Sequence, residues 1–144
     1  GATAISGTNF DTISDYLAGT DIISLETNAG TEVSITRGAN ANTAAAGHAS
    51  VATGVVAFHS ADDTLAERIV AIADAIDENT NGTAGNTTAG EALVFGQGSD
   101  GFIFISDAVA GVSAGDSLIK LAGVAISTSN DVVTLSGGNI TTLA

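Results

Sequence analysis

Aspartates beside glycine-containing turns are the residues of this chain whose type and spacing best fit a chemical role. One group surrounds the turn at Gly19, and a second lies in the turns of the C-terminal region. Calcium takes about six to eight oxygen ligands, including backbone carbonyls, and loops supply both kinds of oxygen. We therefore expect calcium as a candidate cofactor, with these candidate ligands: Asp11, Asp15, Asp21, Asp100, Asp107 and Asp116.

The same aspartates have an alternative role in forming turns. An Asp side chain accepts hydrogen bonds from nearby backbone N–H groups and thereby stabilises a turn without any metal. The chain has no EF-hand spacing, which would have pointed to calcium more specifically. The sequence leaves both roles open.

Other catalytic and cofactor patterns are weak. With no Cys, the chain has no catalytic thiol and no zinc–thiolate site. Its two histidines, His48 and His59, lack zinc-ligand spacing, and no Gly-x-Ser-x-Gly nucleophile motif is present. We expect both histidines to be structural or to lie on the surface, and we expect no enzymatic activity.

The segment Gly96–Gly101 (GQGSDG) matches the dinucleotide-binding pattern G-x-G-x-x-G. That pattern needs a helix directly after it, so that the helix N-terminus meets the pyrophosphate. Here the apolar run Phe102–Ile105 follows, which indicates a strand. The segment therefore predicts a hairpin turn.

Charge narrows the classes of partner. Sixteen Asp and Glu oppose only three basic residues, giving a formal net charge of −13. Nucleic acids and anionic membranes both require a basic surface, so we expect neither as a partner. The acidic balance favours solubility and divalent cations. No apolar stretch approaches the roughly 20 residues of a membrane-spanning helix, so membrane insertion is not expected.

The elements that position these residues are predicted to form one β-rich domain over 1–144. The clearest signal is an amphipathic helix at about 62–78, where Leu65, Ile69, Ile72 and Ile76 share one face. We expect its N-cap oxygens from this group: Ser60, Asp62 and Asp63. A shorter helical spacing is present over 9–17.

Strands are predicted over most of the remaining ordered segments. Because Phe102–Ile105 does not alternate, it should be a central strand buried on both faces. The fold class is mainly β, a β-sandwich-like or rolled sheet with one helix. We expect loops at 37–53 and 79–90, and an exchangeable arm at 1–8. The predicted strands are 21–25, 31–36, 55–59, 92–95, 102–106, 117–121 and 132–135.

Two segments resemble a known bacterial group. Asn9–Leu25 (NFDTISDYLAGTDIISL) resembles the element that follows the calcium-binding repeats of RTX-type proteins. Glu91–Val124 resembles the C-terminal β domain of type I-secreted proteins, through the hairpin at 98–101, the aromatic strand after it and the segment DSLIKL. The chain lacks the repeat array itself, so no repeat ligands carry over.

The resemblance implies a bacterial extracellular protein that the type I secretion machinery exports. Our leading hypothesis is a self-assembling subunit of a surface layer or matrix fibre, whose partners are copies of itself. The termini, 1–8 and 132–143, are β-compatible and could add to a neighbour's sheet. The alternatives are a secretion-competent C-terminal module of a larger enzyme or adhesin, and a small ligand-binding protein, for example for a sugar or haem.

Overall fold

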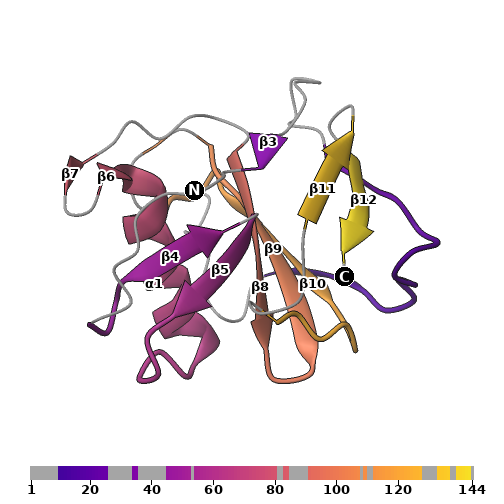
Figure 1. Cartoon of the computed structure of the whole chain (residues 1–144), viewed down its shortest axis with the longest axis horizontal. Helices are drawn as coiled ribbons and strands as arrows, with labels where there is room; N and C mark the ends of the chain where they lie inside the picture. Colours follow the sequence, from indigo (N-terminus) through magenta and orange to yellow (C-terminus); the bar gives the residue numbers. More distant parts are fainter. Residues whose placement is uncertain are drawn as a thin grey trace.

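The computed structural model describes residues 10–25, 34–35, 45–52, 54–80, 83–84, 91–107, 109, 112–127, 133–136 and 139–143. Within them the fold is mainly β with a single helix, which confirms the predicted class (Figure 1). The elements are β1 (Asp11–Ile13), β2 (Ile23–Ser24), β3 (Ser34–Ile35), β4 (Ala49–Ala52), β5 (Val55–Phe58), α1 (Leu65–Asp77), β6 (Glu78–Thr80), β7 (Thr83–Ala84), β8 (Glu91–Gln97), β9 (Asp100–Ile105), β10 (Ser117–Leu121), β11 (Val133–Ser136) and β12 (Asn139–Leu143).

An open mixed sheet forms the centre of the molecule. Its strand order is β1-β10-β9-β8-β5-β4, and β3 also pairs with β8. Strands β8, β9 and β10 are antiparallel neighbours, whereas β5 pairs with β8 and β1 with β10 in parallel. The predicted central strand is confirmed, because β9 lies between two partners and Phe102, Ile103 and Phe104 are almost completely buried. Gly98, at φ 63°, lies in the β8–β9 turn, as the hairpin prediction required.

The two faces of this sheet are covered by different elements. Helix α1 packs on one face through Ile69 and Ile72, against Leu93 and Phe104. A second sheet, of order β11-β12-β2, contributes Ile23, Ile140 and Leu143 to the core on the other face, with Val94 and Ile103. Figure 1 shows α1 beside β4 and β5, with the β11–β12 hairpin at the other side of the central strands. Successive side chains of β8 and β9 therefore pack alternately into two separate cores.

All five phenylalanines lie on the helix-covered face. Four of them form a row of ring contacts, in the order Phe10, Phe102, Phe95 and Phe58, with centroid separations of 5.4–5.6 Å. The fifth, Phe104, is buried in the same core. The remaining aromatic residue, Tyr16, packs against the core on the other face.

Helix α1 confirms the predicted helix but begins differently from the expectation. Its cap is Thr64, whose Oγ1 accepts a hydrogen bond from Glu67 N at 3.3 Å, while Glu67 Oε2 accepts one from Thr64 N at 3.0 Å. This reciprocal pair is a capping box. The predicted N-caps Ser60, Asp62 and Asp63 precede that position, so that prediction was wrong by a few residues.

The short helix predicted over 9–17 was also wrong, since this segment contains β1. Phe10 and Ile13 are three residues apart, a spacing that shares a face in a helix but falls on opposite faces of a strand. Here Phe10 packs into the helix-side core and Ile13 into the other. Both faces of the sheet are covered, so the apolar spacing suits a strand equally well.

Parts of both predicted loops are strands. Within 37–53, β4 pairs antiparallel with β5 through a turn in which Gly54 has φ 82°. Within 79–90, β6 and β7 pair with each other. These short strands were not predicted, because the two segments are rich in small residues and turn-forming residues. The predicted arm at 1–8 lies outside the described residues, whereas β12 of the C-terminal segment pairs with β11 and β2 of the same chain.

Candidate functional site

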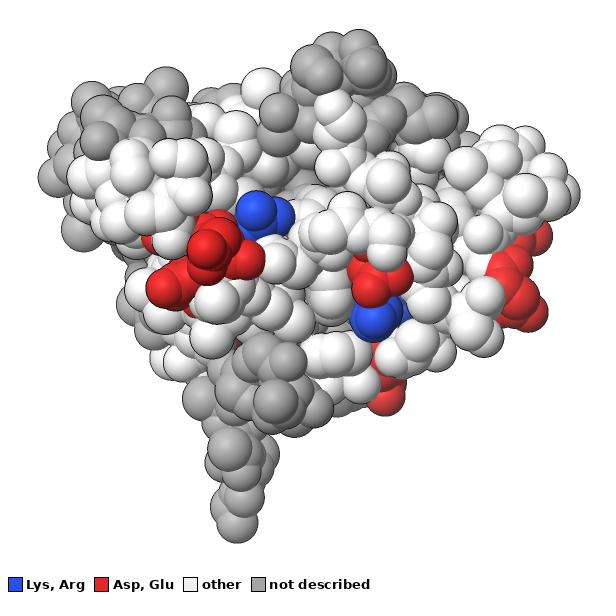
Figure 2. Space-filling view, turned by 90° about the horizontal axis from the view of Figure 1, so that it is seen from below, with Lys and Arg blue, Asp and Glu red and all other residues white. Residues whose placement is uncertain are grey.

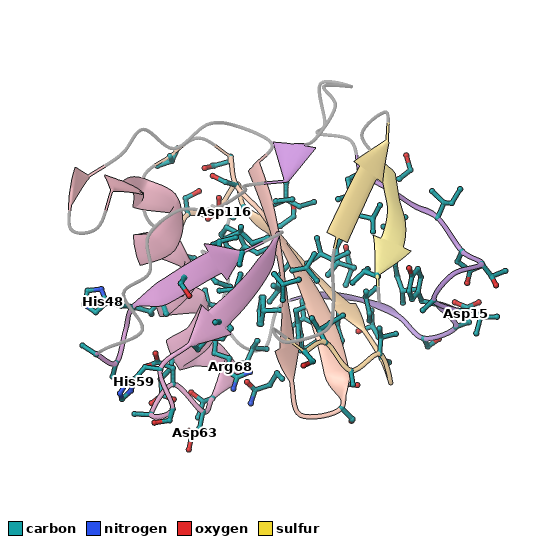
Figure 3. All side chains as sticks on the ribbon, in the orientation of Figure 1. Asp15, His48, His59, Asp63, Arg68 and Asp116 are labelled. Atoms are coloured by element: carbon teal, nitrogen blue, oxygen red, sulfur yellow. The ribbon has the colours of Figure 1, made fainter. Side chains whose placement is uncertain are left out.

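The six candidate calcium ligands occupy three separate places. Asp11, Asp15 and Asp21 belong to β1 and the loop after it, Asp100 begins β9, and Asp107 and Asp116 lie between β9 and β10. Figure 3 places the labelled Asp15 and Asp116 far apart in its view, on different elements. Across the described ranges, no three His, Asp or Glu side chains form a group that could hold a metal ion.

The loop after β1 uses one of its aspartates to fix its own backbone. Asp21 Oδ2 accepts a hydrogen bond from Leu17 N at 2.7 Å, and Leu17 O accepts hydrogen bonds from Thr20 N at 3.1 Å and Asp21 N at 3.0 Å. Beside this loop is a hollow of about 430 Å³ lined in part by Asp15, Tyr16 and Asp21. Burial and the charge of Asp21 raise the pKa of the Tyr16 phenol.

Asp100 joins β9 to β10 and to the turn that follows. Its Oδ2 lies 2.7 Å from Lys120 Nζ, and its Oδ1 accepts a hydrogen bond from Gly123 N at 2.8 Å. The hydrogen bond from Lys120 holds the pKa of the Asp100 carboxyl below its ordinary value, with a further contribution from Gly123. Each of its two oxygens therefore already contacts β10 or the turn after it.

Asp107 and Asp116 are the two predicted ligands that act on a single loop. Asp116 is only 7% exposed and accepts hydrogen bonds from Asp107 N at 3.0 Å and Ser113 N at 2.7 Å. Asp107 Oδ2 accepts one from Ser113 Oγ at 2.6 Å. Burial raises the pKa of Asp116, whereas the Ser113 hydrogen bond lowers that of Asp107. Both side chains thus organise the β9–β10 connection.

A second hollow lies where the carboxyl ends of β5 and β8 separate. Its volume is about 350 Å³. Its lining combines polar side chains with apolar ones and the backbone of Gly96, and comprises Val56, Ala57, Phe58, His59, Ser60, Arg68, Gly96, Ile126 and Ser127. Figure 3 shows the labelled His59 and Arg68 in the same region of the molecule, with Asp63 beside them.

Arg68 is the charged side chain of this hollow and is held by backbone groups. Its Nε donates to Asp62 O at 2.9 Å, and its Nη1 donates to Gly96 O. Its guanidinium also lies over the Phe58 ring, 5.0 Å from the centroid. Burial lowers the pKa of Arg68, and the charges of Asp62 and Asp63 oppose that change. Figure 2 shows acidic atoms beside both groups of basic atoms on the face it presents.

Sequence reasoning missed this hollow altogether. The sequence predicted His59 to be structural or to lie on the surface, and it assigned no role to Arg68. Gly96 was recognised only as part of a turn. The one available signal was that Arg68 is one of three basic residues in a strongly acidic chain and lies within the helix.

The helix among the described residues is not long and apolar enough to cross a membrane. The resemblance to RTX-like secreted proteins gains no further support from comparison with known proteins. Those comparisons find no matching family model, no matching curated protein and no matching solved structure.

Proposed function

We propose that the protein is an extracellular structural subunit that assembles with copies of itself into a bacterial surface layer or matrix fibre. The observation that carries this proposal is a pair of exposed aliphatic side chains beside the outer strand at one end of the open sheet. We call this part of the molecule the β1 surface, and it consists of β1 and the loop 14–22. The acidic, cysteine-free composition and the resemblance to type I-secreted proteins support the same function.

The β1 surface presents two large apolar side chains to solvent. Leu17 is 61% exposed and Ile22 is 64% exposed, and both come from the loop that Asp21 fixes. Burying a large aliphatic side chain contributes about 1.5–3 kcal/mol, so a pair on each copy favours association. Because hydrogen bonds already order the loop, little conformational entropy is lost when it docks.

Strand β1 adds a backbone component to this surface. It lies at one end of the described strand order, with β10 as its partner on the inner side. An outer strand offers N–H and C=O groups to a strand of another molecule. Strand pairing and apolar contact can therefore act together on adjoining parts of two copies.

Acidic side chains on the β1 surface oppose this association. Asp11, Asp15 and Asp21 are all exposed there, so two facing copies repel each other at low ionic strength. Calcium would relieve the repulsion by taking carboxylate oxygens from both copies. We therefore propose that calcium promotes assembly, with this acidic group as the part of the chain that responds.

The test compares the assembly state of purified protein in calcium with its assembly state in chelator. Sedimentation and negative-stain microscopy measure the assembly state. We expect ordered polymers in calcium, and their loss in a Leu17→Ser/Ile22→Ser variant. The matched control is Val70→Ser/Val109→Ser, which removes two other exposed aliphatic side chains from α1 and a loop. Monomers of the unaltered protein under both conditions would refute the function. Unchanged assembly of the Leu17/Ile22 variant would refute the surface.

A further inference from the structure

The hollow beside Arg68 exists because a parallel ladder stops early. Strands β5 and β8 share one pair, Val55 with Val94, and Val94 N donates to Gly54 O at 3.0 Å. In a continued ladder the next pair would be Ala57 with Gly96, and Gly96 O would accept a hydrogen bond from β5. Arg68 Nη1 donates to that oxygen instead. The opening is thus built into the sheet and stabilised by the guanidinium.

Its position is one where open sheets commonly bind ligands. Strands β5 and β8 are parallel and are joined through α1, so their carboxyl ends lie together on one side. Crevices at the carboxyl ends of parallel strands are preferred ligand positions, because side chains from the following loops converge there. Here the loop after β5 supplies His59 and Ser60.

The polar groups of the hollow include several hydrogen-bond donors. His59 Nδ1 accepts a hydrogen bond from Ala61 N at 3.1 Å, so the neutral imidazole carries its proton on Nε2. The guanidinium of Arg68 has further N–H groups beyond the two that bind Asp62 O and Gly96 O. The Ser60 hydroxyl can donate as well. Such a lining suits a ligand rich in oxygen acceptors.

Local charge favours a neutral ligand over an anion. Asp62 is only 3% exposed. The negative charges of Asp62 and Asp63 already act on the Arg68 guanidinium. A bound anion would place another negative charge near these aspartates with no further cation among the lining residues. Val56 is only 2% exposed, so the partly buried Phe58 and Ile126 supply the apolar surface, which matches the C–H faces of a sugar ring.

We propose that this hollow binds a neutral sugar of monosaccharide size. Arg68, His59 and Ser60 donate to its hydroxyl oxygens, and the apolar residues contact its ring. A volume of about 350 Å³ is at the lower end of the range for small-molecule sites. The hollow and the β1 surface involve different residues, so binding is expected in the monomer and does not depend on self-assembly.

The experiment titrates isotope-labelled monomer separately with glucose, galactose, N-acetylglucosamine and acetate. The readout is the change in amide NMR shifts. We expect saturable shifts at Phe58, His59 and Gly96 for at least one sugar, with a dissociation constant on the order of 1 mM. Acetate should produce no saturable shift there. Saturation by acetate alone would identify an anion site and refute the proposal, as would the absence of saturation by all four probes.

Variants assign the binding to the named residues. Arg68→Lys keeps the positive charge but loses the planar donor array, so sugar affinity should fall about tenfold or more. Because Arg68 also supports Gly96, a second variant, Ser60→Val, tests an exposed position in the turn after β5. Lys120→Ala changes a cation outside the hollow and should bind normally. Full affinity in both the Arg68 and Ser60 variants would overturn the proposal.

Discussion

Replacing Gly96 by Ala tests how the segment 124–127 lies on the sheet. Gly96 pairs with Gly101 across the β8–β9 hairpin, and together they leave room for a crossing backbone. A Cβ at position 96 would lie far inside van der Waals contact with the Ile126 carbonyl oxygen. Backbone cannot yield as a side chain does, so the segment must move away from the sheet.

The cost follows from the side chains that this segment carries. Val124 and Ile126 are partly buried against the core that faces β11 and β12. Full burial of such a side chain contributes about 1.5–3 kcal/mol, so losing roughly half of each burial costs about 1.5–3 kcal/mol in total. For a domain of this size, that corresponds to a fall in melting temperature of about 5–10 °C.

The assay is urea unfolding monitored by circular dichroism, and Gly101→Ala is the matched control. A Cβ at Gly101 would meet Val124 O at 2.9 Å and Ile126 Cγ1 at 3.0 Å, and part of that contact is with a movable side chain. The Gly101 variant should therefore lose clearly less stability than the Gly96 variant. Equal stability of Gly96→Ala and the unaltered protein would show that segment 124–127 does not lie against β8.

Three further outcomes are expected. Thr64→Ala removes the N-cap hydroxyl of α1 and should cost about 1 kcal/mol in thermal unfolding; no loss would contradict the capping assignment. Ile72→Ala should cost about 2–5 kcal/mol in urea unfolding because Ile72 is fully buried, whereas Val70→Ala on the exposed side of α1 should change little. The pairing with Lys120 lowers the pKa of the Asp100 carboxyl in the folded protein. This pairing therefore stabilises the fold above the ordinary carboxyl pKa of 3.8, and the stabilisation is lost as the pH falls through the lowered pKa of the folded state. Melting temperatures of Asp100→Asn should therefore fall less on acidification than those of the unaltered protein, and identical acid profiles would refute this role.

Long apolar patterns in the sequence predicted the fold well. The spacing of Leu65, Ile69 and Ile72 located the helix, and the unbroken apolar run Phe102–Ile105 located the central strand. Both signals are local, since a period of apolar residues fixes the face that an element buries. The capping residue was misplaced because several oxygen-bearing side chains precede the helix, and only the Thr64–Glu67 reciprocity distinguishes one of them.

Features that depend on distant partners were not predictable in the same way. The spacing of Phe10 and Ile13 fits either a helix or a strand, and pairing with β10 decides between them. Likewise, the hollow requires Arg68 to reach Gly96, a contact that no local pattern encodes. The aspartates were predicted at turns, but which backbone N–H groups Asp116 binds depends on the conformation of the β9–β10 connection.

The pairing of β1 with β10, and of β2 with β12, has a kinetic consequence. Asp11 lies opposite Ile119, and Ile23 lies opposite Ile140, so both N-terminal strands require partners from the C-terminal part of the chain. The β8–β9–β10 meander needs only neighbouring sequence and is the natural place for folding to begin, because short loops close at little entropic cost. A chain that emerges N-terminus first from a ribosome can therefore form the helix-side core once β10 is available, but it cannot complete the core that contains Ile140 and Leu143 until β12 is released.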